Sequence, residues 1–159
     1  MPLTYVGLGA NIGEPRRQIE AAIEEMRNIP GTKVLLVSGI YKSAPVGVAD
    51  QPDFLNAVAL LDTGLAPEAL LERLQDIERR HGRERPFPGA PRTLDLDLLL
   101  YGDQVLATPR LTLPHPRMHE RAFVLAPLAE IAPQAAVPGR GGVGGLLAAC
   151  RDQAVERID

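Results

Sequence analysis

The sequence is poor in the residues that usually mark a secreted or membrane-bound protein. Its 159 residues include no tryptophan and a single cysteine, Cys150. One cysteine cannot form a disulfide within the chain, so nothing indicates an oxidising compartment, and its Leu and Ala neighbours favour a small buried side chain over a nucleophile. No apolar run approaches the ~20 residues of a membrane helix, and residues 1–5 lack the basic and apolar parts of a signal peptide. We therefore expect a cytoplasmic protein that has no membrane partner.

Positive charge is also scarce. The net charge is −3 and the isoelectric point is about 5.6, which argues against the strongly basic field of a nucleic-acid-binding domain. Lys33 and Lys42 are the only lysines; arginine, whose flat fork suits phosphate, carries the remaining positive charge, although genome base composition can produce the same bias. The apolar fraction of 45% and the charged fraction of 23% are typical of a globular protein. The length predicts a single domain over residues 1–159.

The hydrophobic periodicities predict an α+β protein. The main elements are expected in the order strand 3–8, helix from Pro15 to the stop at Pro30-Gly31, strand 33–41, strand 54–61, helix from Pro67 to Gly82, and strand 93–100. This is the β-α-β-β-α-β order of a ferredoxin-like sandwich, in which both helices cover one face of a mainly antiparallel sheet.

Three further segments should add to this core. We expect a hairpin through Gly102-Asp103 into a strand at 104–106, a helix near 117–125 and a C-terminal helix near 143–153. The intervening loops at 42–52 and 83–92 are long enough to act as lids over a site.

Two carboxylates are the strongest chemical signal. Asp95 and Asp97 alternate with Leu94, Leu96 and Leu98, so in a strand the carboxylates share one face and the leucines point into the core. Two neighbouring carboxylates repel each other, and a cation relieves the repulsion; oxygen ligands without His or Cys favour magnesium over zinc. A solvated edge strand gives the same alternation, and the spacing alone does not distinguish the two interpretations.

Basic side chains on both sides of this strand favour the metal interpretation. Phosphoryl transfer requires positioning and charge neutralisation, which magnesium and arginine supply together. Any one of these residues could be an ordinary surface residue, but as a set they indicate a phosphate site; they are Arg83, Arg85, Arg92, Arg110, His115 and Arg121. The turn at residues 9–13 matches neither a Walker loop nor a dinucleotide fingerprint and adds little on its own.

Residues 91–99, PRTLDLDLL, resemble the signature of the 6-hydroxymethyl-7,8-dihydropterin pyrophosphokinase family. Further segments resemble other motifs of that family in the same order, namely residues 9–11, 50–57, 110–116 and 121–125. The resemblance implies an enzyme of folate biosynthesis that transfers the β,γ-pyrophosphoryl unit of ATP to the hydroxymethyl group of a reduced pterin and leaves AMP. It also implies two magnesium ions, with ATP and the pterin as small-molecule partners. We further expect a monomer, and the charge balance argues against a nucleic-acid partner.

The resemblance also implies roles for individual residues. Metal binding falls to Asp95 and Asp97, and catalysis to Arg83, Arg85, Arg92 and Asp97. The residues expected to contact ATP are Gln75, Glu78, Arg83, Arg85, Arg92, Arg110, Thr112, His115 and Arg121. The residues expected to contact the pterin are Ser43, Ala44, Val46, Phe54, Asn56 and Phe123.

The chemistry of these residues agrees with the resemblance. A flat bicyclic ring stacks well between two aromatic rings, here Phe54 and Phe123, and the amide of Asn56 can donate and accept at a pterin edge. Ordinary core packing is the alternative for both phenylalanines. The chain departs from the family in having Phe87 but no tryptophan before the signature, and Ala10 where serine is common.

Two other classes of function are compatible with such a fold. An RNA recognition motif would need aromatic residues and a basic face on the central strands, where this chain has Asp95 and Asp97. A non-catalytic nucleotide or metal sensor would bind ATP without releasing AMP, so AMP release separates it from the enzyme.

Overall fold

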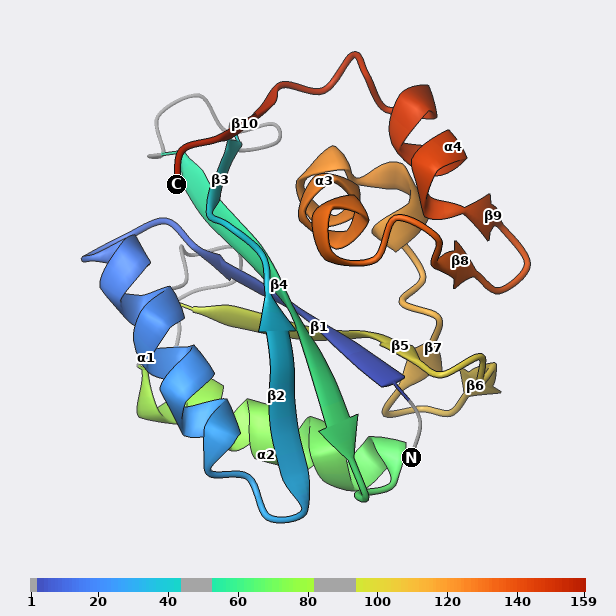
Figure 1. Ribbon diagram of the computed structural model, residues 1–159. Helices are drawn as coiled ribbons and strands as arrows, with labels where there is room; N and C mark the ends of the chain where they lie inside the picture. The colour runs from blue at the N-terminus through green and yellow to red at the C-terminus, as the bar shows by residue number, and fades with distance from the viewer. Residues whose placement is uncertain (1–2, 44–52, 82–93) are drawn as a thin grey trace.

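The computed structural model describes residues 3–43, 53–81 and 94–159 as one mixed α+β arrangement (Figure 1). The main sheet has the order β10-β3-β4-β1-β5, with β2 also paired to β4, and each of these pairings is antiparallel. Its strands are β1 (Leu3–Ala10), β2 (Thr32–Val37), β3 (Tyr41–Ser43), β4 (Phe54–Thr63), β5 (Asp95–Tyr101) and β10 (Val155–Arg157).

Helices and two small ribbons complete the described residues. The helices are α1 (Pro15–Arg27), α2 (Pro67–Arg80), α3 (Ala122–Ile131), α4 (Val143–Ala149) and the 3-10 turn η1 (Met118–Glu120). The ribbons pair β6 (Leu106–Ala107) with β7 (Thr112–Leu113), and β8 (Ala136–Val137) with β9 (Gly141–Gly142). No helix within the described residues is long and apolar enough to cross a bilayer.

The sheet has a hydrophobic core on each face. Helices α1 and α2 cover the first face of the sheet, and α3 and α4 cover the second (Figure 1). Ile19 of α1 and Leu74 of α2 are fully buried in one cluster, and Leu125 of α3 and Val143 of α4 in the other. Both α1 and α2 begin with proline at the first helical turn, where the missing N–H is tolerated. The expected α+β sandwich, with these two helices on one face of an antiparallel sheet, is confirmed.

The central strand β4 shows how the two faces are separated. Ala57, Ala59 and Leu61 belong to the cluster under α1 and α2, whereas Val58 and Leu60 belong to the cluster under α3 and α4. This alternation follows from the two-residue period of a strand. It also shows which face of the sheet each of the remaining residues of β4 lies on.

Several predicted boundaries were wrong. The strand expected at 33–41 is split into β2 and β3, because the hydroxyl of Ser38 accepts the N–H of Val58 and interrupts the regular ladder. The chain after Gly102 does not return along β5; the Gly102 N–H bonds to the Leu3 carbonyl, and β6 pairs with β7 instead.

The C-terminal part also differs from the prediction. The helix expected near 117–125 is the turn η1 followed by α3, which continues past Pro127 to Ile131. The last helix ends at Ala149 and is followed by β10, which pairs with β3. A strand of three residues has too few positions to show a periodicity, so sequence reasoning missed it.

Candidate functional site

Strand β5 holds the predicted carboxylates as expected. Asp95 and Asp97 are half-buried, whereas Leu94, Leu96 and Leu98 are buried. The carboxylates alternate with Leu96 and Leu98, which lie in the first core cluster, so they point toward the face that α3 and α4 cover. The predicted alternation is confirmed, while metal binding itself stays a prediction.

The neighbouring strand places glycine opposite each carboxylate. Gly9 of β1 is paired with Asp95 and Gly7 with Asp97. On its other side, Gly9 is paired with Asn56 of β4. Directly paired residues share a face of the sheet, so Asn56, Gly9 and Asp95 form one row across three strands, and the middle member has no side chain.

Asn56 is held in place by a hydrogen bond from Ser43, and the glycine beside it leaves room for its amide. It is 5% exposed, and its Oδ1 accepts a hydrogen bond of 2.7 Å from the hydroxyl of Ser43. A Cβ added at Gly9 would lie 3.2 Å from Asn56 Nδ2, which is a tight contact. The glycine therefore makes room for the amide, and Ser43 fixes its orientation.

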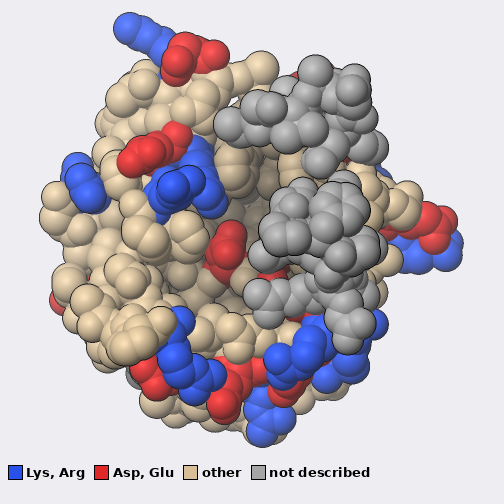
Figure 2. All heavy atoms as spheres, turned by 180° about the vertical axis from the view of Figure 1, so that it is seen from behind, with Lys and Arg blue, Asp and Glu red and all other residues tan. Residues whose placement is uncertain are grey.

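A pocket opens at the edge of β5 that faces α2. It measures about 240 Å³ and is lined by Asp97, Arg110, Thr112 and His115 together with apolar residues of α2 and β5. The structure thus brings together four residues that the sequence predicted for metal or ATP. Figure 2 shows acidic side chains inside a hollow of this molecule and a group of basic side chains beside it.

Two hydrogen bonds orient His115. Its main-chain N–H donates to the Leu99 carbonyl at 2.9 Å, and its ring Nδ1 accepts the main-chain N–H of Arg117 at 3.1 Å. The ring proton is therefore on Nε2, which lies 4.0 Å from Asp97 Oδ1. Burial lowers the pKa of His115, the Asp97 charge opposes this, and Arg121 and Arg117 lower it further. The imidazole is consequently neutral at pH 7.

Two residues predicted for different substrates touch each other. The guanidinium of Arg121 lies 5.5 Å from the centre of the Phe123 ring, a cation–π geometry. Phe123 packs against the cluster of the second face. Phe54 and Asn56 lie on that same face, because they are four and two residues before Val58 in β4. The phosphate side and the pterin side of the expected site therefore meet at the start of α3.

Glu78, which was predicted to face the nucleotide, packs against β5. It is 4% exposed and its Oε2 accepts the N–H of Leu96 at 2.8 Å, while its contact with ATP stays a prediction. A helical position alone does not reveal that this side packs on β5. Its carboxylate binds the backbone of β5 between Asp95 and Asp97. Gln75, on the same helix, is half-buried.

Some predicted residues cannot be placed. Ala44, Val46, Arg83, Arg85 and Arg92 lie outside the described residues. The pairing of Gly7 and Gly9 with the two carboxylates and the hydrogen bond between Glu78 and Leu96 were not predicted, because they depend on strand register and helix packing.

The donor chemistry fits magnesium. Within the described residues no group of three or more His, Cys, Asp or Glu is arranged to hold a metal, so Asp95 and Asp97 would act as a pair. Magnesium is commonly bound by one or two carboxylates together with substrate phosphates and water, and a carboxylate pair beside a pocket lined by Arg110 and His115 is compatible with this pattern.

Comparison with known proteins gives consistent matches. A family model described as 7,8-dihydro-6-hydroxymethylpterin-pyrophosphokinase (HPPK) matches residues 5–133. A Pseudomonas aeruginosa protein named 2-amino-4-hydroxy-6-hydroxymethyldihydropteridine pyrophosphokinase is 51% identical over 154 residues, 97% of this chain and 95% of its own length. A Haemophilus influenzae protein of the same name is 45% identical over 138 residues, 87% of this chain and 86% of its own length.

Solved structures show the same fold. The structure of Plasmodium falciparum HPPK-DHPS wild type with pteroate matches with a TM-score of 0.74 over 93% of this chain at 12% identity. This chain spans 42% of the length of that protein. At such low identity the likeness concerns the fold alone.

Proposed function

The chain belongs to the 7,8-dihydro-6-hydroxymethylpterin-pyrophosphokinase family, and on this premise we propose how its residues share the reaction. It is an ATP-dependent transferase that moves a pyrophosphoryl group from ATP to 6-hydroxymethyl-7,8-dihydropterin in folate synthesis. The observation that carries the division of roles is the row Asn56–Gly9–Asp95 across β4, β1 and β5.

The row has the dimensions that the reaction needs. Adjacent strands are about 4.8 Å apart, so the backbones at Asn56 and Asp95 are separated by roughly 9.6 Å. That is the scale of a bicyclic ring with a hydroxymethyl arm. Asn56 would bind the hydrogen-bonding edge of the pterin, the bare backbone of Gly9 would lie under the ring, and the hydroxyl would reach the carboxylates of β5.

Aromatic residues on the same face would hold the ring. Phe54 and Phe123 are both half-buried, so each leaves part of its ring accessible for stacking. Ser43 would act through Asn56 by fixing its amide, and Ala44 and Val46 would add contacts from the following segment.

Asp95 and Asp97 would hold two magnesium ions. When bound, these ions would offset phosphate charge and lower the pKa of the substrate hydroxyl. Asp97 is the proposed acceptor for the hydroxyl proton because it lies at the pocket that also contains Arg110, Thr112 and His115. The neutral His115 would donate from Nε2 without adding charge.

The remaining phosphate contacts follow from the family resemblance. Arg110 and Thr112 line the pocket at the β5 edge, where they would bind phosphate or ribose oxygens, and Gln75 would contact the nucleotide from α2. Arg83, Arg85 and Arg92 would offset charge on the transferred group and on AMP, and Arg121 would add a further phosphate contact.

Other features of the protein also remain proposals. We propose a single-domain monomer that works in the cytoplasm, uses only small-molecule substrates and binds no nucleic acid. The net charge of −3 supports the last point. Light scattering of the purified protein and electrophoretic mobility with RNA test the monomeric state and the absence of RNA binding.

Product analysis tests the activity. The protein, ATP, magnesium and 6-hydroxymethyl-7,8-dihydropterin are incubated together, and nucleotides are separated by chromatography. The proposal requires AMP and the pterin pyrophosphate in equal amounts. ADP, or no product, would contradict it and would favour an ordinary kinase or a sensor.

A carboxylate variant tests the metal assignment. Asp97→Ala should retain the fold by circular dichroism while turnover falls by orders of magnitude. Asp103→Ala is the matched control, because Asp103 is exposed in the turn that follows β5. Unchanged turnover in Asp97→Ala would remove the metal role from this residue.

A further inference from the structure

The C-terminal strand lies beside the pterin residues. In β10, Val155 is paired with Ser43 and Arg157 with Tyr41 of β3. On its other side β3 pairs with β4, where Ser43 is opposite Phe54 and Tyr41 is opposite Asn56. Strand β3 therefore lies between the end of the chain and the residues proposed to bind the pterin.

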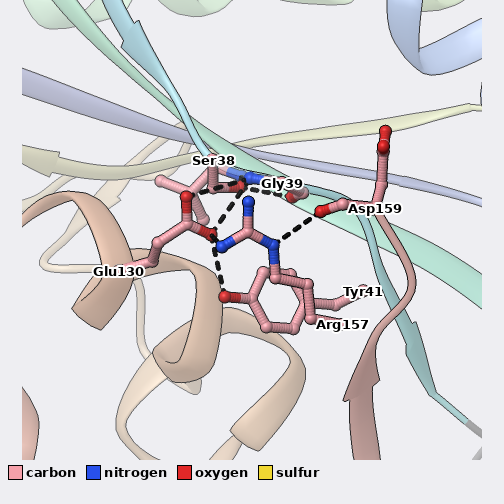
Figure 3. A network of polar contacts seen from close by, with 7 residues as sticks. Ser38, Gly39, Tyr41, Glu130, Arg157 and Asp159 are labelled. Carbon is pink, nitrogen blue, oxygen red and sulfur yellow. Dashed lines mark hydrogen bonds and ion pairs between the residues drawn. The ribbon is translucent and has the colours of Figure 1, made fainter.

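Glu130, near the end of α3, is the centre of a polar network that joins three segments (Figure 3). Its carboxylate accepts the N–H of Gly39 at 3.0 Å and the hydroxyl of Tyr41 at 2.8 Å, and it lies 3.6 Å from Arg157 Nη1. The Glu130 side chain is 25% exposed and that of Arg157 is 53% exposed, so water screens the ion pair and the two hydrogen bonds are the more specific contacts.

The network is closely fitted around Gly39. A Cβ at this position would lie 2.5 Å from Arg157 Nε and 2.7 Å from the main-chain oxygen of Asp159, so any larger residue would displace this segment. Arg157 Nε donates to that same oxygen at 2.6 Å, and the Ile158 N–H donates to the Ile40 carbonyl at 2.9 Å. Burial, and then Glu130, raise the pKa of Tyr41 to about 12, so its hydroxyl stays a donor at neutral pH.

The same network connects both sides of the proposed pterin site. Helix α3 carries Phe123 near its start and Glu130 near its end, about two turns or 10 Å apart. Strand β3 carries Tyr41, bonded to Glu130, and Ser43, bonded to Asn56. Glu130 thus ties the helix that presents one aromatic residue to the strand that orients the amide.

We propose that Glu130, Tyr41 and Arg157 are positioning residues that fix α3 against β3 and thereby set the spacing between Phe123 and the Phe54–Asn56 edge. The idea rests on the proposed binding of the pterin by these residues. None of the three needs to touch a substrate. Their loss would allow the two sides of the pterin site to move apart, while the pocket at β5 would keep its shape.

Steady-state kinetics with each substrate varied separately test this proposal. In Glu130→Ala and Tyr41→Phe, KM for the pterin should rise by about tenfold, the factor that corresponds to one hydrogen bond of about 1.4 kcal/mol. KM for ATP should change less than twofold. Glu130→Gln keeps an oxygen that can accept the Tyr41 hydroxyl, so it should lie closer to the wild type.

Glu156→Gln is the matched control, because Glu156 is exposed on the same strand and its side chain alternates with that of Arg157. Both KM values should match the wild type in this variant. If Glu130→Ala does not fold, the milder Tyr41→Phe gives the same comparison.

Equal changes in both KM values, or a lower melting temperature with unchanged KM values, would mean that the network only stabilises the fold and would overturn the proposal. Failure of the wild type to form AMP would instead contradict the proposed function, so the two failures are distinguishable.

Discussion

Replacement of Glu78 by alanine is the most direct test of how the carboxylate strand is supported. Glu78 Oε2 accepts the Leu96 N–H at 2.8 Å, and both residues are 4% exposed. In the sheet as described, β5 is the last strand, so this N–H has a side chain as its acceptor rather than another strand. The bond lies between the two residues proposed to bind magnesium.

The size of the effect follows from these contacts. A hydrogen bond to a charged group contributes about 1.5–3 kcal/mol, and its loss leaves a buried N–H without an acceptor. The removal of a buried carboxylate relieves part of its desolvation cost, so we expect a net loss of about 2 kcal/mol in the free energy of unfolding. For a domain of this length, that corresponds to a decrease in Tm of about 4–8 °C.

Thermal unfolding followed by circular dichroism measures this change. Glu78→Gln keeps an oxygen acceptor at the same position but not the charge, so its loss should be about half as large. Arg73→Ala, on the exposed side of the same helix, is the control and should stay within about 0.5 kcal/mol of the wild type.

Enzyme activity gives an independent measurement. If Glu78 holds the Asp95–Asp97 segment in place, the magnesium concentration for half-maximal AMP formation should rise in Glu78→Ala, and excess magnesium should recover part of the rate. A Tm within 1 °C of the wild type, together with an unchanged magnesium dependence, would refute the supporting role of this carboxylate.

Three further predictions concern the second face of the sheet. Gly9→Ala places a Cβ 3.2 Å from Asn56 Nδ2, so KM for the pterin should rise several-fold while KM for ATP stays constant; equal KM values in variant and wild type would contradict the contact. Leu99 is fully buried, and Leu99→Ala should lower the free energy of unfolding in urea by about 2–5 kcal/mol. The pKa of Tyr41 is raised from 10.0 to about 12, so its stabilising contribution is complete below pH 10 and is lost as the pH rises toward 12. The Tm difference between wild type and Tyr41→Phe should therefore shrink over that interval, and a constant difference would show that Tyr41 does not titrate as described.

The sequence predicted those parts of the site that depend on local order. Asp95 and Asp97 alternate with leucines within one strand, so their common face could be inferred without the fold. Glu78 could not be assigned in this way, because its contact with Leu96 depends on how α2 packs against β5. The positions of Gly7 and Gly9 opposite the two carboxylates depend on the register of β1 and β5, which no local pattern specifies.

The same limit explains the differences in the fold. Helices α1 and α2 have regular apolar stripes and proline at their starts, and both were predicted close to their observed bounds. The break between β2 and β3 depends on a bond from Ser38 to the distant Val58. Strand β10 exists because Val155 and Arg157 pair with residues more than 100 positions earlier, so its three residues carry almost no signal of their own.

The row of Asn56, Gly9 and Asp95 across β4, β1 and β5 also limits how mutation could change the proposed substrate site. Its length is two inter-strand spacings, and backbone hydrogen bonds rather than side chains set that length. If Asn56 and Asp95 bind the substrates as proposed, point mutations there would alter recognition at each end but would not lengthen the interval between the two residues. We therefore expect directed evolution to broaden tolerance for substituents on the ring more readily than tolerance for a longer arm between the ring and the alcohol.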